Sequence, residues 1–238
     1  EYGMHMTHND TTKQAGTQRM GTIGRFTVAM GAAGMISMMG MAGLGVLSGT
    51  STPALAAPEP SPVSTQWEFT FEDGPLRLAW VDDGEGKKPY FYLTYTVTNH
   101  WGGVKFFAPD VHLMSDNANV LRSGRGVSSD VTQEIMDRLD NPLLESPNDI
   151  VSNVLDGVEH ARDGLVIWPA TDLEADEVTV FFAGLSGESQ AYVVGRETDN
   201  PQRYTLRKTL MLRYSTPGEL AEQGDSPFEL AEKRWVMR

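Results

Sequence analysis

Apolar and polar residues alternate with a period of two along much of the chain after residue 66, and this pattern predicts β-strands. The clearest strand is 90–98 (YFYLTYTVT), in which Phe91, Leu93, Tyr95 and Val97 fall on one face. The same signals, bounded by turn residues, predict about eight to ten strands in all. Twelve segments are candidates for these strands, and the eleven besides 90–98 are 67–72, 76–80, 104–107, 110–115, 120–121, 158–162, 165–168, 178–182, 191–195, 204–214 and 228–238.

Two local patterns add detail to this series of strands. The turn sequence Asp73-Gly74-Pro75 between 67–72 and 76–80 predicts a β-hairpin. Residues 129–140 change to helical spacing, with Asp130 as a candidate cap, and Ser146 followed by Pro147 predicts the start of a second short helix. The apolar residues of these helices are Ile135, Met136 and Leu139, then Ile150, Val151, Val154 and Leu155.

Many short strands with one helical insertion at about 129–157 predict a mainly β domain, a β-sandwich, over residues 66–238. Residues 57–65 (APEPSPVST) precede it as a Pro/Ser-rich linker, expected to be extended and mobile. The chain shows no internal repeat. We therefore expect a single domain behind a linker.

Four segments carry a resemblance to a known class: YFYLTYTVTN (90–99), FAPDVHLMSDNANVL (107–121), DGLVIWP (163–169) and DEVTVFFAGL (176–185). With them, roughly residues 67–214 resemble the small exported immunoglobulin-like domains common in bacterial proteins of unknown function. The resemblance implies an immunoglobulin-like β-sandwich through strand order and turn chemistry, and it carries no site residues. The insertion at 129–157 departs from the plain pattern, and fold alone implies no function.

Residues 1–56 have the pattern of an export signal. Basic residues precede a long uncharged stretch with an apolar centre, which ends in a small-residue Ala-x-Ala site, so cleavage is expected between Ala56 and Ala57. The basic residues are Lys13, Arg19 and Arg25, and the apolar centre is FTVAMGAAGMISMMGMAGLGVL. This pattern predicts an exported protein, periplasmic or secreted, with no membrane attachment after cleavage.

An uncleaved membrane anchor is the alternative interpretation, because the stretch is longer than the roughly 20 apolar residues that span a bilayer. Repeated Gly, Ser and Thr residues dilute its hydrophobicity and favour the cleaved signal. Met4, Met6 and Met20 are candidate start residues, which makes 1–20 a candidate non-native or misannotated extension.

The charge of the chain narrows the range of partners. The full sequence has a net charge of −13, and removal of residues 1–56 leaves 16 basic and 30 acidic residues, a net charge of −14. Nucleic acid and anionic membrane surfaces need clustered Lys and Arg, so neither is expected as a partner. The chain has no cysteine, which excludes disulfides, thiol catalysis and thiolate metal sites.

No catalytic, cofactor or metal motif follows the signal. Gly184-Leu185-Ser186 has only part of the nucleophile-elbow pattern, and His100, His112 and His160 lack the spacing of a zinc site. The acidic turns are closer to solvated hairpin loops than to calcium loops. The turn residues in question are Asp82, Asp83 and Glu85, then Asp116, Asn117 and Asn119. We therefore assign no catalytic, cofactor or metal residue.

Trp101, Phe106 and Phe107 cluster near one loop and form the candidate binding surface, because exposed aromatic patches bind sugars or proteins. The favoured hypothesis is a non-catalytic exported module that binds an unknown protein or glycan of the envelope. A carboxylate-dependent hydrolase of sugars or peptides and a purely structural envelope component are the alternatives. The insertion at 129–157 is the first place to look for specificity.

Overall fold

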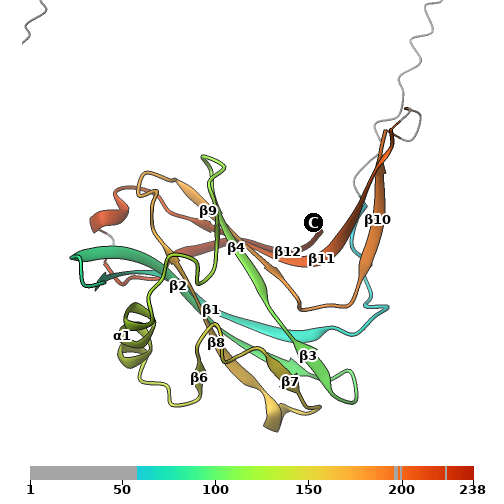
Figure 1. Cartoon of the computed structure of the whole chain (residues 1–238), viewed down its shortest axis with the longest axis horizontal. Helices are drawn as coiled ribbons and strands as arrows, with labels where there is room; N and C mark the ends of the chain where they lie inside the picture. Colours follow the sequence, from blue (N-terminus) through green and yellow to red (C-terminus); the bar gives the residue numbers. More distant parts are fainter. Residues whose placement is uncertain (1–57, 196–197, 199, 223) are drawn as a thin grey trace, which may run out of the picture. The chain divides into compact units, whose positions relative to one another are not determined.

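The computed structural model describes residues 58–195, 198, 200–222 and 224–238 (Figure 1). The predicted signal over 1–56 and its cleavage site at Ala56 and Ala57 lie outside these residues. Within the described residues the protein is mainly β, as the alternation predicts, with one α-helix and two short 3-10 helices. They are α1 (Ser129–Leu139), η1 (Val158–His160) and η2 (Leu220–Glu222).

Two open sheets and a small ribbon make up the domain. The first sheet has the order β1-β2-β8-β6, in which β6 runs parallel to β8 and the other pairs are antiparallel. Its strands are β1 (Phe69–Asp82), β2 (Lys87–Asn99), β8 (Arg162–Pro169) and β6 (Leu144–Glu145).

The second sheet has the order β10-β11-β9-β4-β5, with β12 also paired to β11, and all its pairs are antiparallel. Its strands are β10 (Ser189–Val194), β11 (Gln202–Ser215), β9 (Glu177–Ala183), β4 (Asp110–Ser115), β5 (Val120–Arg122) and β12 (Glu229–Met237). The ribbon pairs β3 (Lys105–Phe107) with β7 (Ser152–Val154).

The core lies between the two sheets. Phe91 and Trp168 of the first sheet and Phe182 and Leu212 of the second belong to one cluster of buried side chains. A second buried cluster covers the opposite face of the first sheet, where Tyr92 packs with α1 (Figure 1). Because β2 is buried on both faces, it has aromatic residues on both of its alternating sides.

The predicted hairpin at 67–80 is wrong, because β1 is one continuous strand. Its whole length pairs with β2, and the register shifts between Asp73 and Leu76, where the turn sequence makes a β-bulge. Gly and Pro residues are typical of bulges as well as of turns, and the long β2 supplies partners for both halves.

The second predicted helix is also wrong. The stretch from Ser146 makes a single turn, in which the Ile150 N–H donates to the Ser146 carbonyl at 3.2 Å, and the chain then enters β7 and η1. β7 pairs with β3 and places Val154 in the core, so pairing across the ribbon overrides the local helical pattern.

The linker is held at Ser61. The Ser61 N–H donates to Glu188 Oε1 at 2.8 Å, and the Ser61 carbonyl accepts from Lys208 Nζ at 3.4 Å. These two hydrogen bonds attach the linker to the domain at Ser61, within the segment that the sequence predicts to be extended and mobile.

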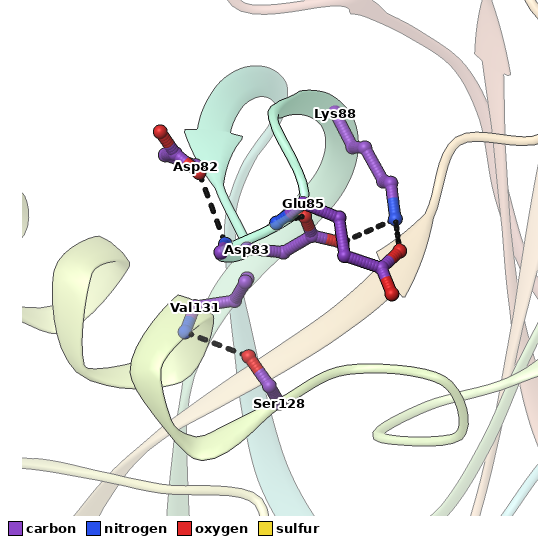
Figure 2. A network of polar contacts seen from close by, with 7 residues as sticks. Asp82, Asp83, Glu85, Lys88, Ser128 and Val131 are labelled. Carbon is purple, nitrogen blue, oxygen red and sulfur yellow. Dashed lines mark hydrogen bonds and ion pairs between the residues drawn. The ribbon is translucent and has the colours of Figure 1, made fainter.

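Ser128 caps α1, where the sequence suggested Asp130. The Ser128 hydroxyl accepts from the Val131 N–H at 3.2 Å (Figure 2), and Asp130 lies in the first turn. We expect Ser128→Ala to lower the free energy of unfolding by about 1 kcal/mol, because the N–H loses its acceptor. Urea denaturation of both proteins measures the difference.

Ser129→Ala is the matched control for this prediction. The Ser129 hydroxyl donates to Asp130 Oδ1 at 3.3 Å and caps none of the described helix N–H groups, so its loss leaves them unaffected. A Ser128→Ala variant as stable as Ser129→Ala would contradict the capping role.

Candidate functional site

A cleft of about 860 Å³ lies beside the helical insertion, and we call it the insertion cleft. The helical insertion forms one side through α1 and the turn at 146–151, and the loop at 122–127 and strands β4 and β8 form the other. A loop-and-helix insertion on a rigid sheet is a common way to build a binding site. A volume of this size suits a small ligand.

The loop at 122–127 is fixed to the first sheet. Gly124 has a φ of +77° and Gly126 a φ of +75°, so the loop turns sharply at two positions that favour glycine. The Gly124 N–H donates to the Ile167 carbonyl at 2.9 Å, and the Ile167 N–H donates to Ser123 Oγ at 3.2 Å. These bonds hold one rim of the cleft against β8.

Neutral polar side chains make up much of the cleft lining. Hydroxyl and amide groups each donate and accept hydrogen bonds, which suits a ligand rich in hydroxyl groups. The side chains are Ser123, Ser129, Thr132, Gln133, Ser146 and Asn148. Ligand sites are usually lined mainly by apolar groups, so this lining points to a very polar ligand.

Tyr95 of β2 lines the cleft from the core side. Its ring lies 4.8 Å from the ring of Phe182 and stacks on that of Phe71, and the residue is 2% exposed. Its hydroxyl has no hydrogen-bond partner in the described structure. Burial raises the pKa of this hydroxyl, and the charge of Glu145 raises it further, so the group remains a proton donor.

Gly164 of β8 makes room for the end of the Tyr95 ring. The two residues are cross-strand partners, and a Cβ atom at position 164 would lie 2.3 Å from Tyr95 Cζ and 2.4 Å from Tyr95 Oη. Only glycine fits at position 164 while the tyrosine keeps this orientation.

Three charged side chains lie at the cleft. Arg122 pairs with Asp110 through its Nε, at 3.1 Å, and Asp149 accepts from the Ser146 hydroxyl at 2.6 Å. Arg125 is exposed, and its side chain makes no ion pair or hydrogen bond with the described residues. Among the described residues that line the cleft, Arg125 is therefore the one unpaired cation, although the protein as a whole is acidic.

Phe107 does not belong to the predicted aromatic surface, whereas Trp101 and Phe106 are exposed. Phe107 is fully buried in the core, because adjacent strand residues face opposite sides and Phe106 takes the outer one. Phe106 is 61% exposed on β3, opposite Asn153. Trp101 is 45% exposed and lines a separate hollow of about 300 Å³ with Trp235.

The acidic turns are occupied by protein contacts. Lys88 Nζ lies 2.6 Å from Asp83 Oδ2 and 2.7 Å from Glu85 Oε2 (Figure 2), and these contacts raise the pKa of Lys88. Asn117 Nδ2 donates to Asp172 at 2.9 Å. Within the described ranges, no three His, Asp or Glu side chains form a group that could hold a metal ion.

The carboxyl groups with shifted pKa values do not lie in the insertion cleft. Hydrogen bonds lower the pKa of Asp83, Asp172 and Glu188, through Lys88, Asn117 and the Ser61 N–H respectively. A lowered pKa means that the ionised carboxylate is favoured over the protonated form that could donate a proton. Among the described residues that line the cleft, Asp149 is the one carboxyl group.

Sequence reasoning placed specificity in the insertion, and residues of the insertion line the cleft described above. Sequence reasoning did not identify Tyr95 as a site residue, because the alternation over 90–98 predicted only that Tyr95 lies in the core. The isolated Gly164 within a buried strand was the available signal, because glycine in a strand often marks a close approach of another group.

Comparison with protein-family models, curated proteins and solved structures found no match to this chain. None of the helices in the described residues has the length and hydrophobicity needed to span a bilayer.

Proposed function

We propose that this protein is an exported, non-catalytic β-sandwich module that binds a glycan of the cell envelope in the insertion cleft. The observation that carries the proposal is the lining of the cleft by six neutral hydrogen-bonding side chains. Five of them donate a hydrogen bond to a protein atom, and their oxygen atoms can still accept hydrogen bonds from a ligand. A hydroxyl-rich ligand forms hydrogen bonds with such groups without the burial of an unpaired charge.

The sandwich and its immunoglobulin-like class are part of this proposal. Side chains from both sheets share one core, as in sandwiches. The order β1-β2-β8-β6 corresponds to the A-B-E-D sheet of immunoglobulin domains, and β11-β9-β4 corresponds to the G-F-C sheet. The parallel pairing of β6 with β8 and the added β12 depart from that pattern.

Export is supported by the signal pattern over 1–56, with cleavage proposed between Ala56 and Ala57. Intact mass of the native protein from its own cells tests it. A soluble species that starts at Ala57 is the expected result. A membrane-bound species that retains residues 26–47 would contradict the cleaved signal.

Glycan binding is tested with a blocked cleft. We expect wild-type protein to bind oligosaccharides from the envelope in isothermal titration calorimetry, and Gln133→Trp to weaken binding at least tenfold by filling the cleft. Asp137→Trp is the matched control, because Gln133 Nε2 donates to Asp137 Oδ1 at 2.7 Å and both variants break this bond. Asp137 does not line the cleft.

Two results would overturn glycan binding in the cleft. One is the absence of binding to every oligosaccharide tested. The other is an equal loss of affinity in Gln133→Trp and Asp137→Trp, which would assign the effect to the helix instead of the cleft.

A further inference from the structure

Two unused hydrogen-bonding groups at the insertion cleft indicate what kind of sugar it accepts. The Tyr95 hydroxyl is buried with no partner, and the Arg125 guanidinium at the rim has no carboxylate to pair with among the described residues. The guanidinium only donates hydrogen bonds, and the neutral tyrosine hydroxyl has one proton to donate, so an acceptor on the ligand would satisfy both groups.

The Tyr95 hydroxyl is a feature that packing alone does not explain. A buried hydroxyl without a partner costs free energy, and phenylalanine would fill nearly the same volume without that cost. The structure also places Gly164 opposite the ring so that this end of the side chain fits. An acceptor supplied by a ligand at the cleft floor would satisfy the hydroxyl.

Tyr214 provides an internal comparison. Its hydroxyl is likewise buried and unpartnered, and burial raises its pKa in the same way. Tyr214 does not line the insertion cleft, whereas Tyr95 does. The unpartnered hydroxyl therefore costs folding free energy at both positions, but only Tyr95 lies at the cleft where a ligand would bind.

Arg125 differs from the other arginine at the cleft. Arg122 is neutralised by Asp110 at 3.1 Å, and the cleft carboxylate of Asp149 is held by Ser146. The planar guanidinium of Arg125 is therefore free to bind a carboxylate through two parallel hydrogen bonds. On a chain with a net charge of −13, an unpaired cation at the main cleft favours an acidic group on the ligand.

We propose that the insertion cleft selects a glycan that carries carboxylate groups, such as a uronic acid oligosaccharide. Arg125 pairs with a sugar carboxylate at the rim, and the Tyr95 hydroxyl donates a hydrogen bond to a sugar oxygen at the floor. This inference rests on the proposed glycan-binding function and adds the class of sugar.

The test compares two matched ligands by isothermal titration calorimetry. One is a trisaccharide of glucuronic acid, and the other is the same trisaccharide with its carboxyl groups reduced to neutral hydroxymethyl groups. We expect wild-type protein to bind the acidic form at least tenfold more tightly, with a preference that falls as salt is raised from 50 to 300 mM.

Arg125→Gln is expected to remove the preference and leave the neutral trisaccharide bound as in the wild type. Arg203→Gln is its control, because Arg203 is also exposed but lies on β11, outside the cleft. Tyr95→Phe is expected to lower the affinity for both trisaccharides about tenfold without lowering the melting temperature of the protein. Tyr214→Phe should leave both affinities unchanged.

The outcomes separate the inference from the function on which it rests. Equal affinity for the two trisaccharides would overturn the acidic preference while glycan binding stands. Equal effects of Tyr95→Phe and Tyr214→Phe would overturn the role of Tyr95. Binding of neither trisaccharide, together with no binding of envelope oligosaccharides, would overturn the proposed function itself.

Discussion

Lys208→Met is expected to lower the free energy of unfolding by about 3–5 kcal/mol, the usual cost of removing one partner from a buried ion pair. The Lys208 side chain is 3% exposed, and its Nζ lies 2.8 Å from Glu68 Oε2 and 3.5 Å from Glu188 Oε2. Without the ammonium group, two carboxylates face each other with little water around them. Chemical denaturation at pH 7 measures the loss.

The pH dependence gives this prediction a second readout. The Ser61 N–H and Lys208 lower the pKa of Glu188 in the folded protein. Glu188 therefore stabilises the wild type at pH values above the pKa that it has in the unfolded chain. This stabilisation is lost as the pH falls through the pKa of Glu188 in the folded state. In Lys208→Met the carboxylates repel each other, and protonation relieves the repulsion. The stability difference between the two proteins should therefore narrow below about pH 4.

Lys88→Met is the matched control for Lys208→Met. Lys88 also bridges two carboxylates, Asp83 and Glu85, but its side chain is 45% exposed and water screens the charges. Its replacement should leave the unfolding free energy close to that of the wild type. Similar losses in both variants would contradict the argument from burial.

Gly164→Ala is expected to destabilise the protein by about 1–3 kcal/mol through overpacking, and to abolish ligand binding in the insertion cleft. The new Cβ would lie 2.3 Å from Tyr95 Cζ. The Tyr95 ring has little freedom to move, since the rings of Phe71, Phe107 and Phe182 surround it. Thermal denaturation and calorimetry with the sugar ligand measure the two effects.

A double-mutant cycle tests whether the cost of Gly164→Ala comes from Tyr95. Tyr95→Leu shortens the side chain, so on this background Gly164→Ala should cost much less than in the wild type. Additive losses would place the strain elsewhere in β8.

The fold could be predicted from the sequence where one signal controlled a whole element. The alternation over 90–98 predicted β2, and the helical spacing after residue 129 predicted α1. The prediction failed at 73–75 and 146–157, where a local turn or helix signal competed with pairing to a distant strand. Such pairing depends on partners that no local window contains.

The candidate site could be predicted only in outline. The insertion was identified as the place for specificity, and its polar residues do line the cleft. The cleft also depends on the loop around Gly124, just before the insertion, and on Tyr95, which lies far from the insertion in sequence. The predicted aromatic surface was wrong at Phe107, because Phe106 and Phe107 are adjacent in a strand, and strand geometry sends Phe107 into the core.

The way β1 begins has a mechanical consequence. Before β1 joins β2, the Phe69 N–H donates to the Leu185 carbonyl at 2.8 Å and the Gly187 N–H donates to the Trp67 carbonyl at 2.9 Å, while Glu188 holds Ser61. A pulling force applied through the chain before Ser61 would load the Ser61–Glu188 contact first and these two bonds next. The β1–β2 ladder and the core would bear tension only after those attachments had broken.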